Sequence, residues 1–211
     1  YTHHYFLDPP HMITIDLVGL GGTGSQVLTN LARMNEALNG LGHPGLHVRA
    51  WDPDEVTSAN MGRQLFSPAD VGINKALVLV SRINRFFGYD WQAIPELYRG
   101  KLTSNIIITC VDTAKARLTI AEKLRARKQI DEPTDIPYYW LDLGNLQKTG
   151  QCVLGTLTSS TMPSRGTNKV GTYDRKLKTV IQRFPQLKNI KEEKQGPSCS
   201  LAEALEKQDL F

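Results

Sequence analysis

The stretch Gly19-Leu20-Gly21-Gly22-Thr23-Gly24 decides the fold, because it follows the apolar run Ile13–Val18 and precedes a helical pattern. A strand, a tight glycine turn and a helix N-terminus, in this order, are typical of nucleotide-binding α/β folds. Glycines let the backbone approach a ligand, and the unpaired N–H groups at the start of a helix favour a phosphate. The stretch predicts a nucleotide site, but the glycines alone do not distinguish one nucleotide from another.

Strand and helix patterns alternate along the chain on both sides of this turn. Strands are expected at residues 13–18, 46–52, 91–95, 106–111, 138–143 and 152–157, and helices at residues 25–37, 75–87 and 114–128. Alternation of this kind implies a Rossmann-like α/β fold, in which a mostly parallel sheet carries helices on both faces. Ligands of such folds bind at the carboxyl ends of the strands.

The chain has 211 residues, of which 40% are hydrophobic, so we expect one well-buried core at residues 1–157 and a less regular remainder. Residues 158–198 are interpreted as a flexible basic crossover with one short helix near residues 177–183. Residues 165–194 hold nine Lys or Arg and three Asp or Glu, while the whole chain carries a net charge of only +4. A solvated linker, or a contact with an acidic partner surface, is favoured there over nucleic acid.

Composition excludes several classes of protein. The three cysteines, Cys110, Cys152 and Cys199, lack C-x-x-C spacing, which argues against a disulfide framework and a self-contained zinc site. No apolar run approaches the roughly 20 residues of a membrane span, and the first residues do not form a signal peptide. We therefore expect a soluble, cytoplasmic protein. The N-terminal histidines are interpreted as part of a flexible tail and not as metal ligands: His3, His4 and His11.

Polar residues after the second strand indicate which nucleotide is bound. Asp52 ends that strand, where an acid typically accepts hydrogen bonds from ribose hydroxyls; the alternative is a turn residue in Asp52-Pro53-Asp54. Asn60, Arg63 and Lys75 then add an amide and two cations. A triphosphate attacked at its α-phosphate needs such charges and a metal more than a dinucleotide does.

The segment 106–117 supplies a further acid. Its apolar strand runs into Asp112, at the edge of the sheet where a metal-binding carboxylate meets phosphates. The alternative interpretation of Asp112 is a helix N-cap, which is compatible with metal binding. Cys110 is interpreted as a small buried apolar residue.

Five motifs in order resemble the ThiF/MoeB family, relatives of the ubiquitin-activating enzymes. They are Gly19–Gly24, Asp52-x-Asp54, Asn60-x-x-Arg63-Gln64, Lys75, and Cys110-Val111-Asp112 followed by Arg117. The resemblance covers about residues 13–157 and continues more weakly to Cys199. Among subfamilies, the stretch from Gly62 to Pro68 and the long first connection look most like the ThiF-type proteins of the PRTRC genetic system.

The resemblance implies an adenylyltransferase that binds ATP and Mg²⁺, with residues 1–157 as its adenylation domain. Its substrate would be the C-terminal carboxylate of a small ubiquitin-like or sulfur-carrier-like β-grasp protein, and the products an acyl-adenylate and pyrophosphate. Asp52 would hold the ribose, and Asp112 would bind Mg²⁺. The cofactor-binding residues would be Gly19, Gly21, Gly22, Thr23, Gly24, Asp52, Asp54, Arg63, Gln64 and Lys75, and the catalytic residues Asn60, Arg63, Lys75, Asp112 and Cys199.

Cys199 has two interpretations. Ser200 and Glu203 have capping-box spacing for a helix at residues 199–211, and a thiol beside a helix N-terminus is a good nucleophile. In the family, a cysteine at a comparable late position can form a thioester or acyl-disulfide with the activated partner. The alternative is a cysteine that merely precedes a helix cap.

Three departures from the family pattern shape the remaining expectations. Paired C-x-x-C motifs are absent, so no zinc is expected. Family dimers often supply an N-terminal arginine to the neighbouring ATP site, but residues 1–12 contain neither Arg nor Lys; a homodimer remains the expectation. The chain also stops soon after residue 200, where the family continues, which suggests truncation.

Two other functions fit parts of the pattern. An NAD(P)-dependent oxidoreductase would use the glycine turn and Asp52, but it would leave Asn60, Arg63 and Lys75 without a role. A non-catalytic nucleotide-binding scaffold for a β-grasp partner would fit the shortened C-terminus.

Overall fold

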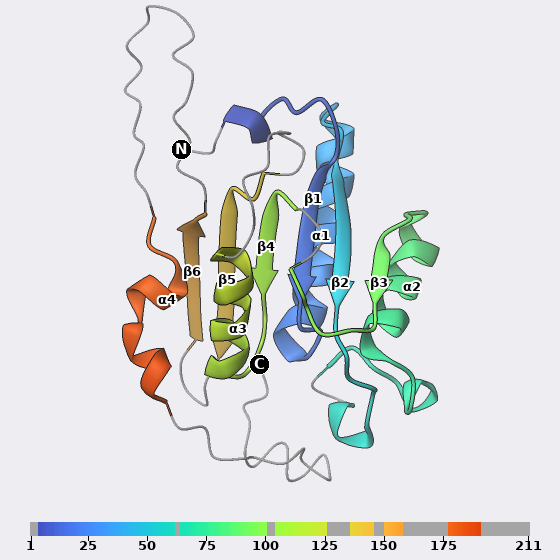
Figure 1. Ribbon diagram of the computed structural model, residues 1–211. Helices are drawn as coiled ribbons and strands as arrows, with labels where there is room; N and C mark the ends of the chain where they lie inside the picture. The colour runs from blue at the N-terminus through green and yellow to red at the C-terminus, as the bar shows by residue number, and fades with distance from the viewer. Residues whose placement is uncertain are drawn as a thin grey trace, which may run out of the picture.

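The computed structural model describes residues 4–61, 64–100, 104–125, 136–145, 150–157 and 177–190. Within these ranges, six strands form a sheet in the order β3-β2-β1-β4-β5-β6 (Figure 1). The strands are β1 (Ile13–Val18), β2 (Leu46–Trp51), β3 (Gln92–Ile94), β4 (Ile106–Thr109), β5 (Tyr139–Asn145) and β6 (Gly150–Thr156). β1 to β5 are parallel, and β6 runs antiparallel to β5. The expected Rossmann-like, mostly parallel sheet is confirmed.

Helices cover both faces of this sheet. The α-helices are α1 (Gly22–Gly40), α2 (Lys75–Phe87), α3 (Ala114–Arg125) and α4 (Val180–Arg183), and short 3-10 helices are η1 (His4–Phe6), η2 (Ser58–Asn60), η3 (Pro68–Asp70) and η5 (Pro185–Asn189). α1 and α2 pack in one apolar cluster with β1 and β2, while α3 and α4 pack in a second cluster on the other face. The sheet is therefore the middle layer of three.

The elements lie close to their predicted positions. The limits of β1 and α2 agree with the prediction, whereas α1 begins at Gly22 instead of residue 25. Helix propensity disfavours glycine, so the pattern alone placed the start too late. α4 falls inside the predicted range 177–183. Residues 158–176 and 191–211 lie outside the described part, so the domain limits stay predictions.

The strand order explains why β1 is apolar at four of its six positions. β1 is paired with β2 on one side and β4 on the other, with Ile15 opposite both Val48 and Ile106. Five of its six residues are buried, as expected for a central parallel strand covered on both faces. The chain also changes direction between β1 and β4, and ligands of open α/β sheets bind at such a switch point.

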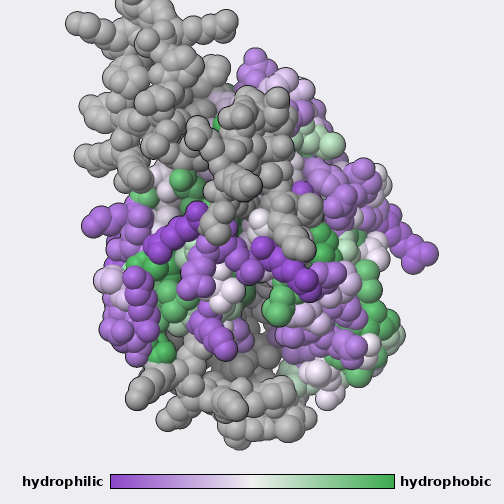
Figure 2. Space-filling view, in the orientation of Figure 1, coloured by the Kyte–Doolittle hydropathy of each residue, from purple (hydrophilic) through white to green (hydrophobic). Residues whose placement is uncertain are grey.

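Apolar side chains fill the two spaces between the sheet and its helices. Leu17, Leu20 and Leu28 belong to the cluster under α1 and α2, and Ile107, Ile120 and Trp140 to the cluster under α3. On the face shown in Figure 2, hydrophilic residues predominate and apolar ones form separate groups. Among the described helices, we find none with the length and hydropathy needed to cross a bilayer.

Candidate nucleotide site

The glycine turn is packed so tightly that two of its positions require glycine. Gly19 has a φ of +89°, and a Cβ there would lie 2.8 Å from the carbonyl oxygen of Cys110. A Cβ on Gly24 would lie 1.8 Å from the carbonyl oxygen of Gly19. The Gly19 N–H also donates to the Trp51 carbonyl at 2.9 Å. The turn therefore sits between the ends of β2 and β4, at the switch point of the sheet.

The N-terminus of α1 differs from that of α2, which is capped by a side chain. No described side chain caps it, and its N-cap position is Gly21. By contrast, the Asn74 side chain accepts hydrogen bonds from the backbone N–H groups of Ala76 and Leu77 at the start of α2. The first turn of α1 therefore keeps N–H groups open, and together with the helix dipole they favour an anion.

Asp52 anchors the turn and is nearly fully buried. One of its carboxylate oxygens accepts a hydrogen bond from the Leu20 N–H at 2.6 Å, and the other accepts one from the Asp54 N–H at 2.9 Å. Burial raises the pKa of Asp52, although these hydrogen bonds and the charge of Lys75 act in the opposite direction. Asp52 thus stabilises the turn Asp52-Pro53-Asp54, as the alternative interpretation predicts. Each of its oxygens keeps a second lone pair for a ribose hydroxyl.

Lys75 is the first residue of α2, and its ammonium is held over the loop after β2. The Lys75 Nζ donates to an Asp54 carboxylate oxygen at 3.2 Å, with the lysine side chain 10% exposed and the aspartate side chain 66% exposed. Asn74 reinforces this arrangement, because its amide donates to the carbonyl oxygens of Asp52 and Asp54. Asn74 is not among the residues predicted from the sequence, although an Asn directly before an amphipathic helical pattern is a signal for a helix cap.

Asn60 and Gln64 are both buried in the connection between β2 and α2, where the Gln64 N–H donates to the Asn60 carbonyl oxygen at 3.2 Å. The Asn60 side-chain oxygen accepts hydrogen bonds from the Thr57 N–H and hydroxyl, while its NH₂ group makes no hydrogen bond within the described residues. The Gln64 amide nitrogen lies 4.0 Å from the position that a Cβ on Gly21 would take. The Gln64 amide thus lies near the turn, and the Asn60 NH₂ group is a potential hydrogen-bond donor in the same connection. Arg63, predicted to contact phosphates, lies outside the described residues, as does Cys199.

Asp112 follows β4 and is exposed at the same edge of the sheet. It does not cap α3, because the Thr113 hydroxyl accepts a hydrogen bond from the Ala116 N–H at 3.1 Å. Its carboxylate makes no hydrogen bond or ion pair with the described part of the chain. Mg²⁺ commonly takes only one or two carboxylates and completes its shell with phosphates and water. One free acid fits that donor set, although no cluster of three potential ligands occurs among the described residues.

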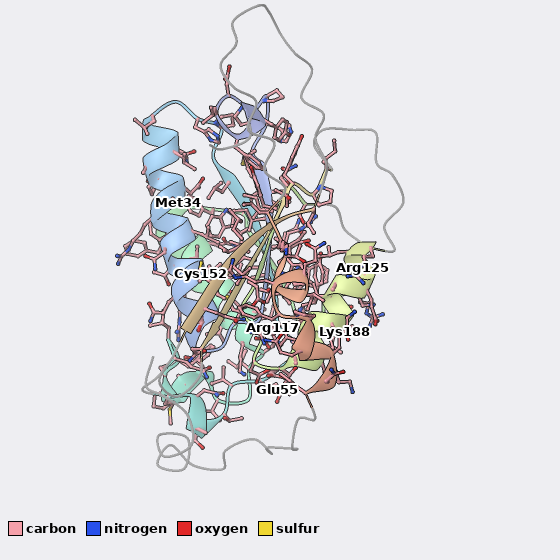
Figure 3. The ribbon with its side chains drawn as sticks, turned by 90° about the vertical axis from the view of Figure 1, so that its left-hand side faces the viewer. Met34, Glu55, Arg117, Arg125, Cys152 and Lys188 are labelled. Atoms are coloured by element: carbon pink, nitrogen blue, oxygen red, sulfur yellow. The ribbon has the colours of Figure 1, made fainter. Side chains whose placement is uncertain are left out.

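A buried polar cluster lies next to this loop; Arg117 belongs to the family motif quoted above, but its partner Asp142 is not predicted from the sequence. Asp142 on β5 pairs with Arg117 on α3, and both side chains are at most 7% exposed. In Figure 3, Arg117 lies on the lower part of α3 and Arg125 at its upper end. Burial, and secondarily the Asp142 carboxylate, raise the pKa of the Cys110 thiol to about 12. Cys110 is thus a partly buried thiol of low reactivity.

This geometry defines a Rossmann-like nucleotide-binding domain. A model of the ThiF family matches residues 11–205. The chain therefore belongs to the ThiF family, the ThiF/MoeB group of adenylyltransferases related to the ubiquitin-activating enzymes. The family prediction is confirmed, whereas the subfamily stays a prediction.

Solved structures with a similar fold include three proteins. The Escherichia coli tRNA N6-threonylcarbamoyladenosine dehydratase TcdA is 21% identical, with 62% of this chain and 50% of that chain covered and a TM-score of 0.47. E. coli MccB is 18% identical, with 68% of this chain and 38% of MccB covered and a TM-score of 0.48. PaaA is 21% identical, with 63% and 38% covered and a TM-score of 0.45. TcdA has been solved with AMP and with ATP, and MccB with MccA.

The aligned part of the chain spans about half the length of TcdA and a smaller share of MccB and PaaA. None of the curated proteins compared with the chain matches it.

Proposed function

We propose that the protein binds ATP and adenylates the C-terminal carboxylate of a small ubiquitin-like β-grasp protein. The observation that carries the proposal is the meeting of three strand ends: the open glycine turn after β1, Asp52 and Asp54 after β2, and the free Asp112 after β4. Family membership, together with the ATP and AMP complexes of TcdA, supports a nucleotide at this edge. MccB, solved with MccA, supports a small substrate partner.

In the proposed reaction, a carboxylate oxygen of the partner attacks the α-phosphorus of ATP. A carboxylate–phosphorus bond forms, the bond from the α-phosphorus to the bridging oxygen breaks, and pyrophosphate leaves with that electron pair. The carboxylate is already ionised, so no general base is required. Rate enhancement then comes from positioning and from stabilising the negative charge on the phosphates.

Each residue at the site has a defined task in this proposal. The N–H groups of α1 bind a phosphate, and Asp52 holds the ribose while it fixes the turn. Lys75, kept close by Asp54, and the Asn60 NH₂ group donate to phosphate oxygens. Arg63 is proposed to add a second cation. Asp112 would hold Mg²⁺, which supplies positive charge to the phosphates when bound.

The proposal also includes transfer of the activated partner to Cys199, a homodimer and a cytoplasmic location. The nicotinamide alternative still leaves Asn60 and Lys75 unexplained. The scaffold alternative predicts nucleotide binding without turnover, so the same experiment separates it from adenylation.

Pyrophosphate exchange into ATP tests the proposal. We expect exchange only when a β-grasp protein with a free C-terminal carboxylate is present, and not with the same protein amidated at its C-terminus. Lys75→Ala should lower exchange about 100-fold, the scale of losing one preorganised charge donor. Arg33→Ala, an exposed cation farther along α1, is the matched control and should not change the rate. ATP binding without exchange, for every partner tried, would favour the scaffold instead.

A further inference from the structure

Asp142 on β5 is a fully buried carboxylate whose two oxygens are both occupied. Arg117 Nε donates to each oxygen at 3.1 Å, which pairs the charges. The Thr109 hydroxyl donates to one oxygen at 2.6 Å, and the Gln151 amide donates to the other at 3.0 Å. Since all of these donors come from the protein itself, the carboxylate is fixed in one orientation.

Two of these donors, Thr109 and Arg117, belong to the two ends of one loop, while Gln151 lies on β6. Thr109 is the last residue of β4, and its hydroxyl is held in turn by the Trp140 indole N–H at 2.8 Å. Arg117 is the fourth residue of α3, and its Nη1 donates to the Thr113 carbonyl at 3.2 Å. Between Thr109 and Thr113 lies Asp112. One carboxylate therefore connects to the start of this loop directly and to its end through Arg117.

The packing leaves little freedom for the guanidinium. Gly144 on β5 makes room for Arg117, because a Cβ at this position would lie 2.7 Å from Arg117 Nη2. A buried ion pair is by itself weak support for stability, because well-packed apolar residues often replace such pairs without loss. A carboxylate bonded to both ends of a loop does more than stabilise the core, since it also sets the geometry of that loop.

We propose that Asp142 and Arg117 are positioning residues that hold the Asp112 loop so that its free carboxylate faces the nucleotide phosphates. The inference rests on the proposed function and adds two residues to it. It assigns them an action through Asp112 and no contact with the nucleotide or the metal. It predicts that their loss weakens the magnesium-dependent part of nucleotide binding and leaves the part supplied by the glycine turn unchanged.

The experiment measures ATP affinity by isothermal titration calorimetry, once with Mg²⁺ and once with EDTA. We expect Asp142→Asn to lower the affinity for MgATP about 10-fold or more, which is the usual effect of disturbing a residue that orients a metal ligand. Affinity in EDTA should stay within about twofold of the wild type. Asp16→Asn is the matched control, because Asp16 also forms a buried ion pair, with Arg49 at 2.7 Å, away from this loop. It should leave both affinities unchanged.

A double-mutant cycle with Asp112→Ala separates positioning from general damage. If Asp142 acts through Asp112, Asp142→Asn should cause no further loss in the Asp112→Ala background. Additive losses, or an unchanged magnesium effect in folded Asp142→Asn, would overturn the inference.

Two outcomes concern folding and the proposed function. If Asp142→Asn does not fold, Thr109→Val keeps the ion pair and removes the hydroxyl at the loop start, with its hydrogen bonds to Asp142 and Trp140. The same magnesium-specific loss is then expected, and its absence counts against the inference. If the wild-type protein itself gains no affinity from Mg²⁺, the magnesium role in the proposed function fails and this inference fails with it. A wild-type gain that Asp142→Asn retains overturns the inference alone.

Discussion

Replacing Gly24 by alanine tests whether the close approach of the glycine turn to α1 builds the site. The new Cβ would lie 1.8 Å from the Gly19 carbonyl oxygen, and the two atoms would have to separate to at least 3.0 Å. Both partners are backbone, so no side chain can move aside, and the β1 end and the start of α1 must shift instead. Overpacking of this kind costs about 3 kcal/mol or more, which exceeds the gain of about 1 kcal/mol from alanine in a helix.

Gly40 offers a matched control at the other end of α1. A Cβ there meets nothing within 4 Å, so Gly40→Ala should stabilise the protein by up to about 1 kcal/mol. Urea denaturation of both variants and calorimetry with MgATP give the comparison. We expect Gly24→Ala to unfold at lower urea and to lose detectable ATP binding, with Gly40→Ala binding normally. A Gly24→Ala protein with wild-type stability and affinity would refute the proposed packing of the turn.

Three further predictions follow from individual contacts. Asn74→Ala should cost about 1 to 2 kcal/mol in urea unfolding, because it removes the cap of α2, and an unchanged midpoint would contradict the cap. Burial raises the pKa of Asp70, but hydrogen bonds from Ser67 and Arg82 outweigh this effect and hold the pKa of the folded state below the ordinary value of 3.8. The stability that results is fully present above pH 3.8. It is lost as the pH falls through the lower pKa that Asp70 has in the folded protein. The difference of about 2 kcal/mol between wild type and Asp70→Asn in unfolding at pH 7 should therefore shrink as acid is added below pH 4. Peptide mapping after iodoacetamide at pH 8 should find exposed Cys152 modified and Cys110, with its pKa of about 12, intact in the native protein.

The sequence by itself determined the class of fold and the backbone platform of the site. The run Ile13–Val18 is apolar at every position but two, which a strand covered on both faces requires, and Gly19 and Gly24 stand where no Cβ fits. Such signals are local, because they depend on the period of the apolar residues and on backbone sterics. For the same reason the limits of α2 could be predicted, since both its apolar period and its cap lie within a few residues.

Only the tertiary structure decided which side chains act together. Asp52 proved to fix Leu20, a contact across 32 residues, and Asp142 proved to reach Thr109 and Arg117 from a neighbouring strand. The period of apolar residues in the sequence does not predict such contacts, because they arise when parallel strands place their carboxyl ends side by side. The same reason separates Asp112 from Thr113: the sequence suggests Asp112 as the helix cap, and only the folded loop shows that the Thr113 hydroxyl caps α3 and leaves the Asp112 carboxylate without a partner among the described residues.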